Sequence, residues 1–365
     1  MANTCLVKNL MMGMVAISLL AGCKKEPAVI HGVDDYNQGM AYLHGNGVDK
    51  NPSLAANLFL AAADAGHPEA MLEIGTCYMY GNGTEQNVAA ALSWIKFAAE
   101  SGSKKAKAYM ALFQVQGIGM EKNEAEGIRL LQAETSAGNA DAMAILANCY
   151  EAGAGVPIDL NKAMQLHSKA VKENIPLSMY FLGRCHANGL AGVNQNDATA
   201  VEWYTKASDA GQVEATGKLG ACYVLGKGVP VDVEKGIALI RQGAQGGDAD
   251  SIHNLGVCHE RGLGTPINVT EAAKCYKTSA ESGCERAMFN YAVCLEQGQG
   301  TAHNPKEAFK WYKKAAEAGI PESMYKLGIC YERGAGVTAS KELSASWLHK
   351  AANAGNADAK KKLTK

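Results

Sequence analysis

The sequence has no excess of charge of either sign. Its 365 residues include 35 Lys or Arg and 36 Asp or Glu, giving a formal net charge of −1, and no run of five or more basic residues occurs. A surface that binds nucleic acid or heparin needs clustered positive charge, so we expect no nucleic-acid partner. Hydrophobic residues make up 47% of the chain, which is enough for a folded core.

Motifs of common metal and catalytic sites are also missing. The nine histidines form no H-E-x-x-H pattern, the cysteines form no C-x-x-C pattern, and no G-K-[ST] follows the recurrent G-x-G loops. These patterns are the usual sources of zinc, thiol-redox and phosphate sites. We therefore expect no metal, no cofactor, no catalytic residue and no enzymatic activity.

The S-x-x-K spacing of serine enzymes that react with β-lactams occurs, among other places, at Ser101 with Lys104 and at Ser323 with Lys326. The supporting S-D-N and K-T-G motifs are absent, so the spacing alone is weak support for that chemistry.

The N-terminus differs from the rest of the chain. The apolar run at residues 10–22 is too short to cross a bilayer as a helix, which takes roughly 20 residues, and it is typical of a signal peptide. Its end, LAGC at residues 20–23, resembles the lipobox of bacterial lipoproteins. The resemblance implies a signal peptide at 1–22, a lipid on Cys23 and a short linker to residue 33. An uncleaved anchor and an ordinary signal peptide are the alternatives.

The residue after that cysteine bears on localisation. It is Lys24 rather than Asp, which in lipoproteins of this kind implies export to the outer membrane. We expect the protein in the cell envelope, anchored by lipid to the outer membrane on its periplasmic side or at the cell surface.

Most of the chain is one repeated pattern. The stretch LGVCHERGLG at residues 255–264 returns as LGICYERGAG at 327–336. Self-alignment gives eight units of 36 residues and a fifth unit of 37: 34–69, 70–105, 106–141, 142–177, 178–214, 215–250, 251–286, 287–322 and 323–358. The polar tail 359–365 resembles the start of a further first helix and is expected to cap the array.

Each unit predicts two helices. The first ends at a Gly, which adopts the left-handed C-terminal cap at little cost. The second begins after a residue whose side chain can accept a bond from the first-turn amides: Asn51, Asn87, Asn123, Asp159, Asn196, Asp232, Asn268, Asn304 and Ser340.

Both helices have an apolar face that needs a partner. In the second helix of 304–319, Ala308, Trp311, Tyr312, Ala315 and Ala316 follow a helical period. All four tryptophans share one repeat position, and we expect them to anchor the core. A Gly or Ala two residues before the cysteine position lets the two helices of a unit approach, so neighbouring units must stack.

The repeat A-x-x-x-L-G-x-x-Y-x-x-G-x-G-V, followed by a helix with W-Y-x-K-A-A-x-x-G, closely resembles the Sel-1-like repeat, a relative of the tetratricopeptide repeat. The resemblance covers residues 34–358. It implies an all-α fold, a right-handed superhelix (solenoid) of nine helix-turn-helix repeats. Members of such a family assemble membrane complexes, regulate envelope functions or contact host proteins.

Seven cysteines share one position of the first helix: Cys77, Cys149, Cys185, Cys222, Cys258, Cys294 and Cys330. Equivalent positions of packed helices lie about 8–10 Å apart, whereas a disulfide needs Cα atoms within about 7 Å. We interpret these cysteines as small buried hydrophobic residues. Cys284, in a turn, is the candidate for an exposed thiol.

A cysteine-rich branch of the family binds or weakly hydrolyses β-lactams and pairs its cysteines in another register. Cys284 matches only half of that pattern, because Ser279 or Ala280 stands at its partner position. A β-lactam-binding protein of this kind remains the alternative function.

The positions that vary between units predict a binding face. These variable positions cluster on one side of each first helix. They lie five, four and one residues before the cysteine position and two and three residues after it. In stacked units they form an inner wall, and we expect it to bind a protein or peptide. The predicted binding residues are Tyr36, Tyr109, Tyr180, Phe181, His253, Phe289 and Tyr325. Packing against the adjacent first helix is the alternative for the position five before the cysteine. The oligomeric state stays open.

Overall fold

The structure is a computed structural model that describes residues 32–364. Every regular element in this range is a helix, and none of these helices combines the length and the hydropathy that a membrane crossing needs. The predicted signal segment 1–22 and the predicted lipidation site Cys23 lie outside the described residues.

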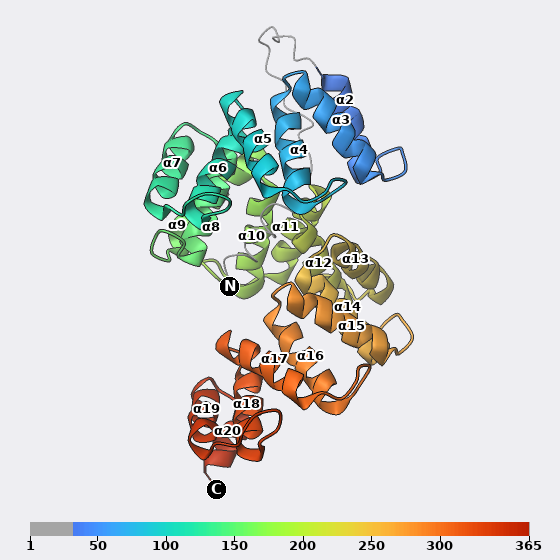
Figure 1. Ribbon diagram of the computed structural model, residues 1–365, viewed down its shortest axis with the longest axis vertical. Coiled ribbons are helices and arrows are strands. Elements are labelled where there is room, and N and C mark those ends of the chain that lie inside the picture. Colours follow the sequence, from blue (N-terminus) through green and yellow to red (C-terminus); the bar gives the residue numbers. More distant parts are fainter. Residues whose placement is uncertain (1–31, 365) are drawn as a thin grey trace. The chain divides into compact units, whose positions relative to one another are not determined.

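The described chain divides into two compact units, at residues 32–195 and 196–364 (Figure 1). The first unit contains α2 (Val33–His44), α3 (Pro52–Asp64), α4 (Pro68–Tyr80), α5 (Val88–Glu100), α6 (Lys104–Gln116), α7 (Glu124–Ser136), α8 (Ala140–Ala152), α9 (Leu160–Ala170), the 3₁₀ helix η1 (Val171–Glu173) and α10 (Pro176–Asn188).

The second unit contains α11 (Asp197–Asp209), α12 (Val213–Leu225), α13 (Val233–Gln245), α14 (Ala249–Arg261), α15 (Val269–Glu281), α16 (Glu285–Gln297), α17 (Pro305–Glu317), α18 (Pro321–Arg333), α19 (Lys341–Asn353) and α20 (Ala357–Leu363). The even-numbered helices are the first helices of the predicted repeats and the odd-numbered ones are the second helices. The tail thus begins a further first helix, as the sequence indicates.

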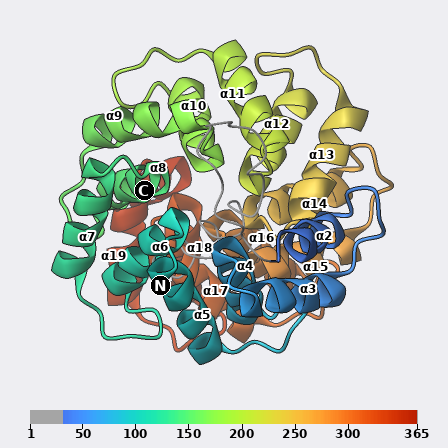
Figure 2. The same cartoon turned by 90° about the horizontal axis from the view of Figure 1, so that it is seen from above.

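Within each unit the helices pack in chain order. Each first helix that is followed by a second helix in the same unit packs against it, and each second helix packs against the next first helix. In the first unit, α7 and α9 lie outside α6 and α8 (Figure 2). The prediction of stacked helix pairs is confirmed, and it places the first helices on one side of the stack.

All nine predicted N-caps are present. The side chain of each predicted residue accepts a hydrogen bond from the backbone N–H three residues later, for example from Glu307 N to Asn304 Oδ1 at 3.1 Å. Such a bond satisfies an amide that has no partner within the helix. The caps therefore fix where each second helix begins.

The two glycines of each G-x-G loop have separate structural roles. The first Gly caps the first helix with a left-handed backbone, as Gly334 does at φ 69°. The second Gly packs on the first turn of the preceding second helix: a Cβ at Gly336 would lie 2.2 Å from the carbonyl oxygen of Pro305. Any side chain at Gly336 would therefore force neighbouring repeats apart.

The core position of the second helix lies one residue after the tryptophan position. Its nine residues are all 5% exposed or less: Phe59, Ile95, Leu131, His167, Tyr204, Ile240, Tyr276, Tyr312 and Leu348. Of the tryptophans only Trp311 is buried, at 8% exposed, while Trp94, Trp203 and Trp347 are half-buried. This corrects the predicted tryptophan anchors: the indoles cover the edge of the core, and the next residue fills it.

The repeated cysteines lie inside the stack. Cys77 and Cys149 are 3% and 2% exposed, and Cys222 alone of the seven is half-buried. Burial raises the pKa of the thiols of Cys77 and Cys149 to about 12. All nine cysteines in the described range are free thiols, consistent with a packing role.

Candidate binding face of the first helices

The predicted binding residues fall in both units. Tyr36 lies on α2, Tyr109 on α6, and Tyr180 and Phe181 on α10; His253, Phe289 and Tyr325 lie on α14, α16 and α18 of the second unit. The two groups are therefore separate candidate sites.

In the first unit, two of the four residues belong to the core. Tyr109 is 2% exposed and stacks on Phe113, with ring centroids 6.4 Å apart. Phe181 is 4% exposed and stacks on the imidazole of His167 at 4.1 Å. Because neighbouring rings already cover them, Tyr109 and Phe181 do not form an exposed binding face, which corrects the prediction for these two.

The other two are partly accessible. The half-buried Tyr36 stacks on His67 at 4.6 Å, and its centroid lies 6.0 Å from that of Phe59. The guanidinium of Arg184 lies 5.8 Å from the centroid of the half-buried Tyr180 ring. These tyrosines contact neighbouring side chains and are half-buried.

His167 has a polar environment that the sequence analysis missed. It is fully buried, its Nδ1 lies 2.9 Å from Ser178 Oγ, and its Nε2 is buried without a hydrogen-bond partner. Burial, with a smaller effect of the Arg184 charge, lowers its pKa to about 3. The sequence does contain a signal for this buried histidine: the other repeats have an aliphatic or aromatic residue at the position of His167.

In the second unit, His253 connects two consecutive first helices. Its Nε2 lies 3.0 Å from Asn290 Nδ2 on α16, and its Nδ1 lies 3.4 Å from Asn254 Oδ1. The amide of Asn290 donates to Nε2, which leaves Nδ1–H to donate to Asn254. The ring is 9% exposed and packs near Tyr276. His253 therefore positions the two asparagines and is itself poorly accessible.

The asparagines keep capacity for a ligand. Both are half-buried, and within residues 32–364 no hydrogen bond uses Asn254 Nδ2 or Asn290 Oδ1. Val257 and Val293, one turn further along the same helices, are also half-buried. We call the residues Asn254, Val257, Asn290, Val293, Tyr325, Lys326 and Ile329 the first-helix face of the second unit.

The predicted aromatic residues border this face. Phe289 is half-buried and packs on Tyr312, with ring centroids 5.9 Å apart. Tyr325 is half-buried on α18. At position five before the cysteine, Phe289 thus packs on the second helix of its own repeat, whereas His253 also contacts the adjacent first helix through Asn290.

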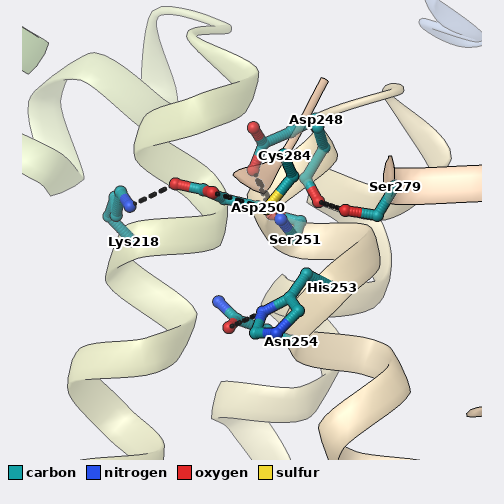
Figure 3. Close-up of polar contacts among 9 residues, drawn as sticks. Lys218, Asp248, Asp250, Ser251, His253, Asn254, Ser279 and Cys284 are labelled. Carbon is teal, nitrogen blue, oxygen red and sulfur yellow. Dashed lines mark hydrogen bonds and ion pairs between the residues drawn. The ribbon is translucent and has the colours of Figure 1, made fainter. Parts of the chain in front are cut away.

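A network of polar groups lies where α12, α14 and α16 begin (Figure 3). Lys218 reaches from α12 to Asp250, with 2.6 Å between Nζ and Oδ2, and the Cys284 thiol donates to Asp250 Oδ1 at 3.6 Å. Asp248 caps α14 by accepting from the backbone N–H of Ser251. Burial alone would raise the pKa of Asp250, but Lys218 brings it below its ordinary value.

Cys284 is not the exposed thiol that the sequence analysis expected. It is 5% exposed, because as the N-cap of α16 it faces the preceding first helix and lies against Asp250. Burial and the Asp250 carboxylate raise the pKa of its thiol to about 11. It therefore stays protonated and unreactive near neutral pH.

Glu214, near the same network, titrates near neutrality. It is 7% exposed and accepts a 2.6 Å hydrogen bond from Gln212 Nε2. Burial is the main cause that raises its pKa to about 7, and the charges of Asp248 and Asp250 add to it. The folded chain therefore holds a proton there that the unfolded chain has released.

We expect Glu214→Gln to flatten the pH dependence of stability. With a folded pKa of about 7 and an unfolded value near 4.5, this group lowers the free energy of unfolding as pH rises between those values, by at most about 1.4 kcal/mol per pH unit. Melting temperatures from pH 4.5 to pH 7 should fall less steeply for Glu214→Gln than for the unchanged protein. The exposed Glu285→Gln is the control, and equal slopes for all three proteins would contradict the assignment.

Glutamates two residues after the cysteine position join consecutive first helices. Glu296 lies 2.7 Å from Lys326 and also accepts from the Tyr312 hydroxyl at 2.7 Å. Glu332 forms the equivalent ion pair with Lys362 at 3.0 Å, and Glu151 pairs with Arg184, at a different position of the next first helix, at 2.6 Å. Each is partly exposed and worth about 0.5 kcal/mol, so their role is mainly to set the register of the stack.

The serine-lysine pairs do not assemble a nucleophile on the second unit. Ser323 is fully buried, and Lys326 is occupied by Glu296. Ser101 is exposed at the end of α5, and Lys104 is exposed at the start of α6. Neither arrangement adds support to the β-lactam alternative.

Comparison with known proteins identifies the repeat. The family model described as Sel1 repeat matches nine segments: 36–67, 68–103, 104–133, 140–174, 176–212, 213–248, 249–284, 285–320 and 321–356. No curated protein matches the chain.

Comparison with solved structures finds similar chains, of which the first shows the same fold. A Sel1 repeat protein from Oxalobacter formigenes is 25% identical, with 67% of this chain and 96% of that chain covered and a TM-score of 0.53. A protective antigen of uropathogenic Escherichia coli with an SLR fold is 26% identical, with coverage of 88% and 77% and a TM-score of 0.42. An immunity protein from Pseudomonas aeruginosa is 19% identical, with coverage of 71% and 84% and a TM-score of 0.40.

Proposed function

Because the chain belongs to the Sel1 repeat family, we propose that it is a binding scaffold whose first-helix face in the second unit holds a protein or peptide segment. The protein acts without catalysis of its own, as an adaptor in envelope assembly, in regulation or in contact with a host. Repeats of this kind expose a long surface made of equivalent positions, which suits an extended partner.

The observation that carries this proposal is the pair of amides held by His253. Asn254 and Asn290 each keep one hydrogen-bonding end open, and they stand at equivalent positions of consecutive repeats. A peptide main chain offers both donors and acceptors, so it can bond to both amides. The half-buried Val257 and Val293 beside them offer apolar contact for its side chains.

Anchoring to a membrane is a second part of the proposal. A lipid on Cys23, with the short linker to residue 33, holds the scaffold close to the bilayer. Mass spectrometry of the N-terminal peptide tests it: an acylated Cys23 is expected, and an unmodified or uncleaved N-terminus would contradict it.

The binding proposal is tested by affinity purification from native membranes with matched variants. We expect discrete partners with the unchanged protein, and their loss with Asn254→Ala/Asn290→Ala/Tyr325→Ala and with the single variant Val293→Glu. The control is Gln242→Ala/Lys277→Ala/Thr278→Ala, at exposed positions of α13 and α15. Circular dichroism must show equal helix content in all four proteins.

Two outcomes contradict the proposal. If both face variants retain the partners, the binding site lies elsewhere. If the unchanged protein recovers no partner beyond the background of an empty affinity matrix, the scaffold function itself fails.

A further inference from the structure

Positive charge gathers at the end of the second unit. Residues 304–365 contain twelve Lys or Arg and six Asp or Glu, while the preceding 303 residues contain 23 and 30. The near-neutral total therefore combines an excess of six positive charges in residues 304–365, from the second helix of the eighth repeat to the tail, with an excess of seven negative charges before them.

Most lysines of this region lie at the surface of α17, α19 and α20, while Lys326 is half-buried on α18. Eight are exposed: Lys306, Lys310, Lys313, Lys314, Lys341, Lys350, Lys360 and Lys361. The helices α17 to α20 pack in order and form the red end of the ribbon (Figure 1). The charge is thus concentrated on one end of a folded unit.

Acidic neighbours neutralise only part of this charge. Glu307 pairs with Lys310 at 2.9 Å, and Glu317 lies 3.8 Å from Lys313. Within the described residues, six of the eight exposed lysines form no ion pair: Lys306, Lys314, Lys341, Lys350, Lys360 and Lys361. We call these six lysines the basic surface.

Two lysines of the basic surface lie on tryptophan rings. Lys314 Nζ lies 4.1 Å from the centroid of the Trp311 ring, and Lys350 Nζ lies 4.1 Å from that of Trp347, at the equivalent position of the next repeat. Leu343, one turn before Trp347 on α19, is 45% exposed. The surface thus combines ammonium groups, the half-buried indole of Trp347 and an exposed aliphatic side chain, which are the groups that favour the headgroup layer of a membrane.

We propose that the basic surface docks on an anionic phospholipid bilayer. The lysines are spread over three helices rather than gathered in a cleft, so they fit an array of mobile phosphates better than one acidic peptide. Each lysine near an anionic membrane adds to the attraction, which decays within a Debye length. This surface lies on helices other than α14 and α16, so docking leaves the amides of Asn254 and Asn290 free for a partner.

The test is co-sedimentation of the full chain with phosphatidylglycerol-containing vesicles and with pure phosphatidylcholine vesicles. The test variant is Lys306→Gln/Lys341→Gln/Lys360→Gln/Lys361→Gln. The control, Lys104→Gln/Lys107→Gln/Lys169→Gln/Lys172→Gln, removes the same charge from exposed positions of the first unit. An apolar or lipidated N-terminus would bind both kinds of vesicle and is the same in all three proteins.

We expect the unchanged protein and the control to bind anionic vesicles at least about tenfold more tightly than neutral ones at low salt, and the test variant to lose this preference. The preference should also vanish in about 1 M salt, where the Debye length is about 3 Å. An equal preference in the test variant and the unchanged protein, or no preference at all, would overturn the proposal. Retention by immobilised poly-glutamate without sedimentation on anionic vesicles would overturn it in favour of an acidic protein partner.

Discussion

Tyr312→Ala is expected to lower the free energy of unfolding of the second unit by about 3–5 kcal/mol, the usual range for removing a buried aromatic side chain. Tyr312 is fully buried at the core position of α17, packs against Phe289, and donates its hydroxyl to Glu296. The substitution leaves a cavity between α16 and α17 and removes one partner of Glu296. Urea unfolding followed by circular dichroism measures the effect.

Tyr312→Phe separates the contribution of the buried ring from that of the hydroxyl hydrogen bond. It keeps the ring and removes only the hydroxyl, and Glu296 keeps its ion pair with Lys326, so a loss of about 1 kcal/mol is expected. If Tyr312→Ala lowers the free energy of unfolding by less than Tyr312→Phe does, the assignment of this position to the core is contradicted.

The second large effect concerns acid stability. His167→Leu/Ser178→Ala is expected to gain stability over the unchanged protein as pH falls. The pKa of His167 is about 3 in the folded chain and near 6.5 in the unfolded chain. Between these pH values the unfolded chain binds a proton at this histidine and the folded chain does not. Stability from this group is lost as pH falls from about 6.5 toward about 3, by about 1.4 kcal/mol per pH unit.

The difference in the free energy of unfolding, double variant minus unchanged protein, should therefore be about 3 kcal/mol larger at pH 4.5 than at pH 7. Two other repeats have a buried Leu at the position of His167, namely Leu131 and Leu348, and most repeats have Ala at the position of Ser178. Both substitutions therefore suit the fold. His349→Gln, at an exposed position of the second unit, is the control and should follow the unchanged protein at every pH. A pH-independent difference for the double variant would show that His167 is not the group responsible.

Local signals in the sequence predicted the fold well. An N-cap such as Asn304 needs only a side chain and an amide three residues away, so the repeat pattern alone located where each second helix begins. The glycine that ends each first helix is equally local. Because every repeat carries both signals, the helix boundaries and the order of stacking followed directly.

Contacts between repeats were harder to predict. Trp311 and Tyr312 are adjacent and both apolar, and periodicity could not tell which of them points into the core. Burial of Cys284 depends on α14, which lies more than 20 residues earlier in the chain, and burial of Tyr109 and Phe181 depends on rings next to them in space. The amide pair of the candidate face was missed because His253, Asn254 and Asn290 meet only when two repeats stack.

The claim that the first-helix face of the second unit binds a protein segment is tested most directly by photo-crosslinking. A benzophenone amino acid replaces Tyr325 on that face or, in a second protein, the exposed Thr278 of α15, and both proteins are irradiated in native membranes. We predict an adduct of discrete mass from position 325 and none from position 278. An adduct from position 278 alone, or none from position 325, would contradict the claim.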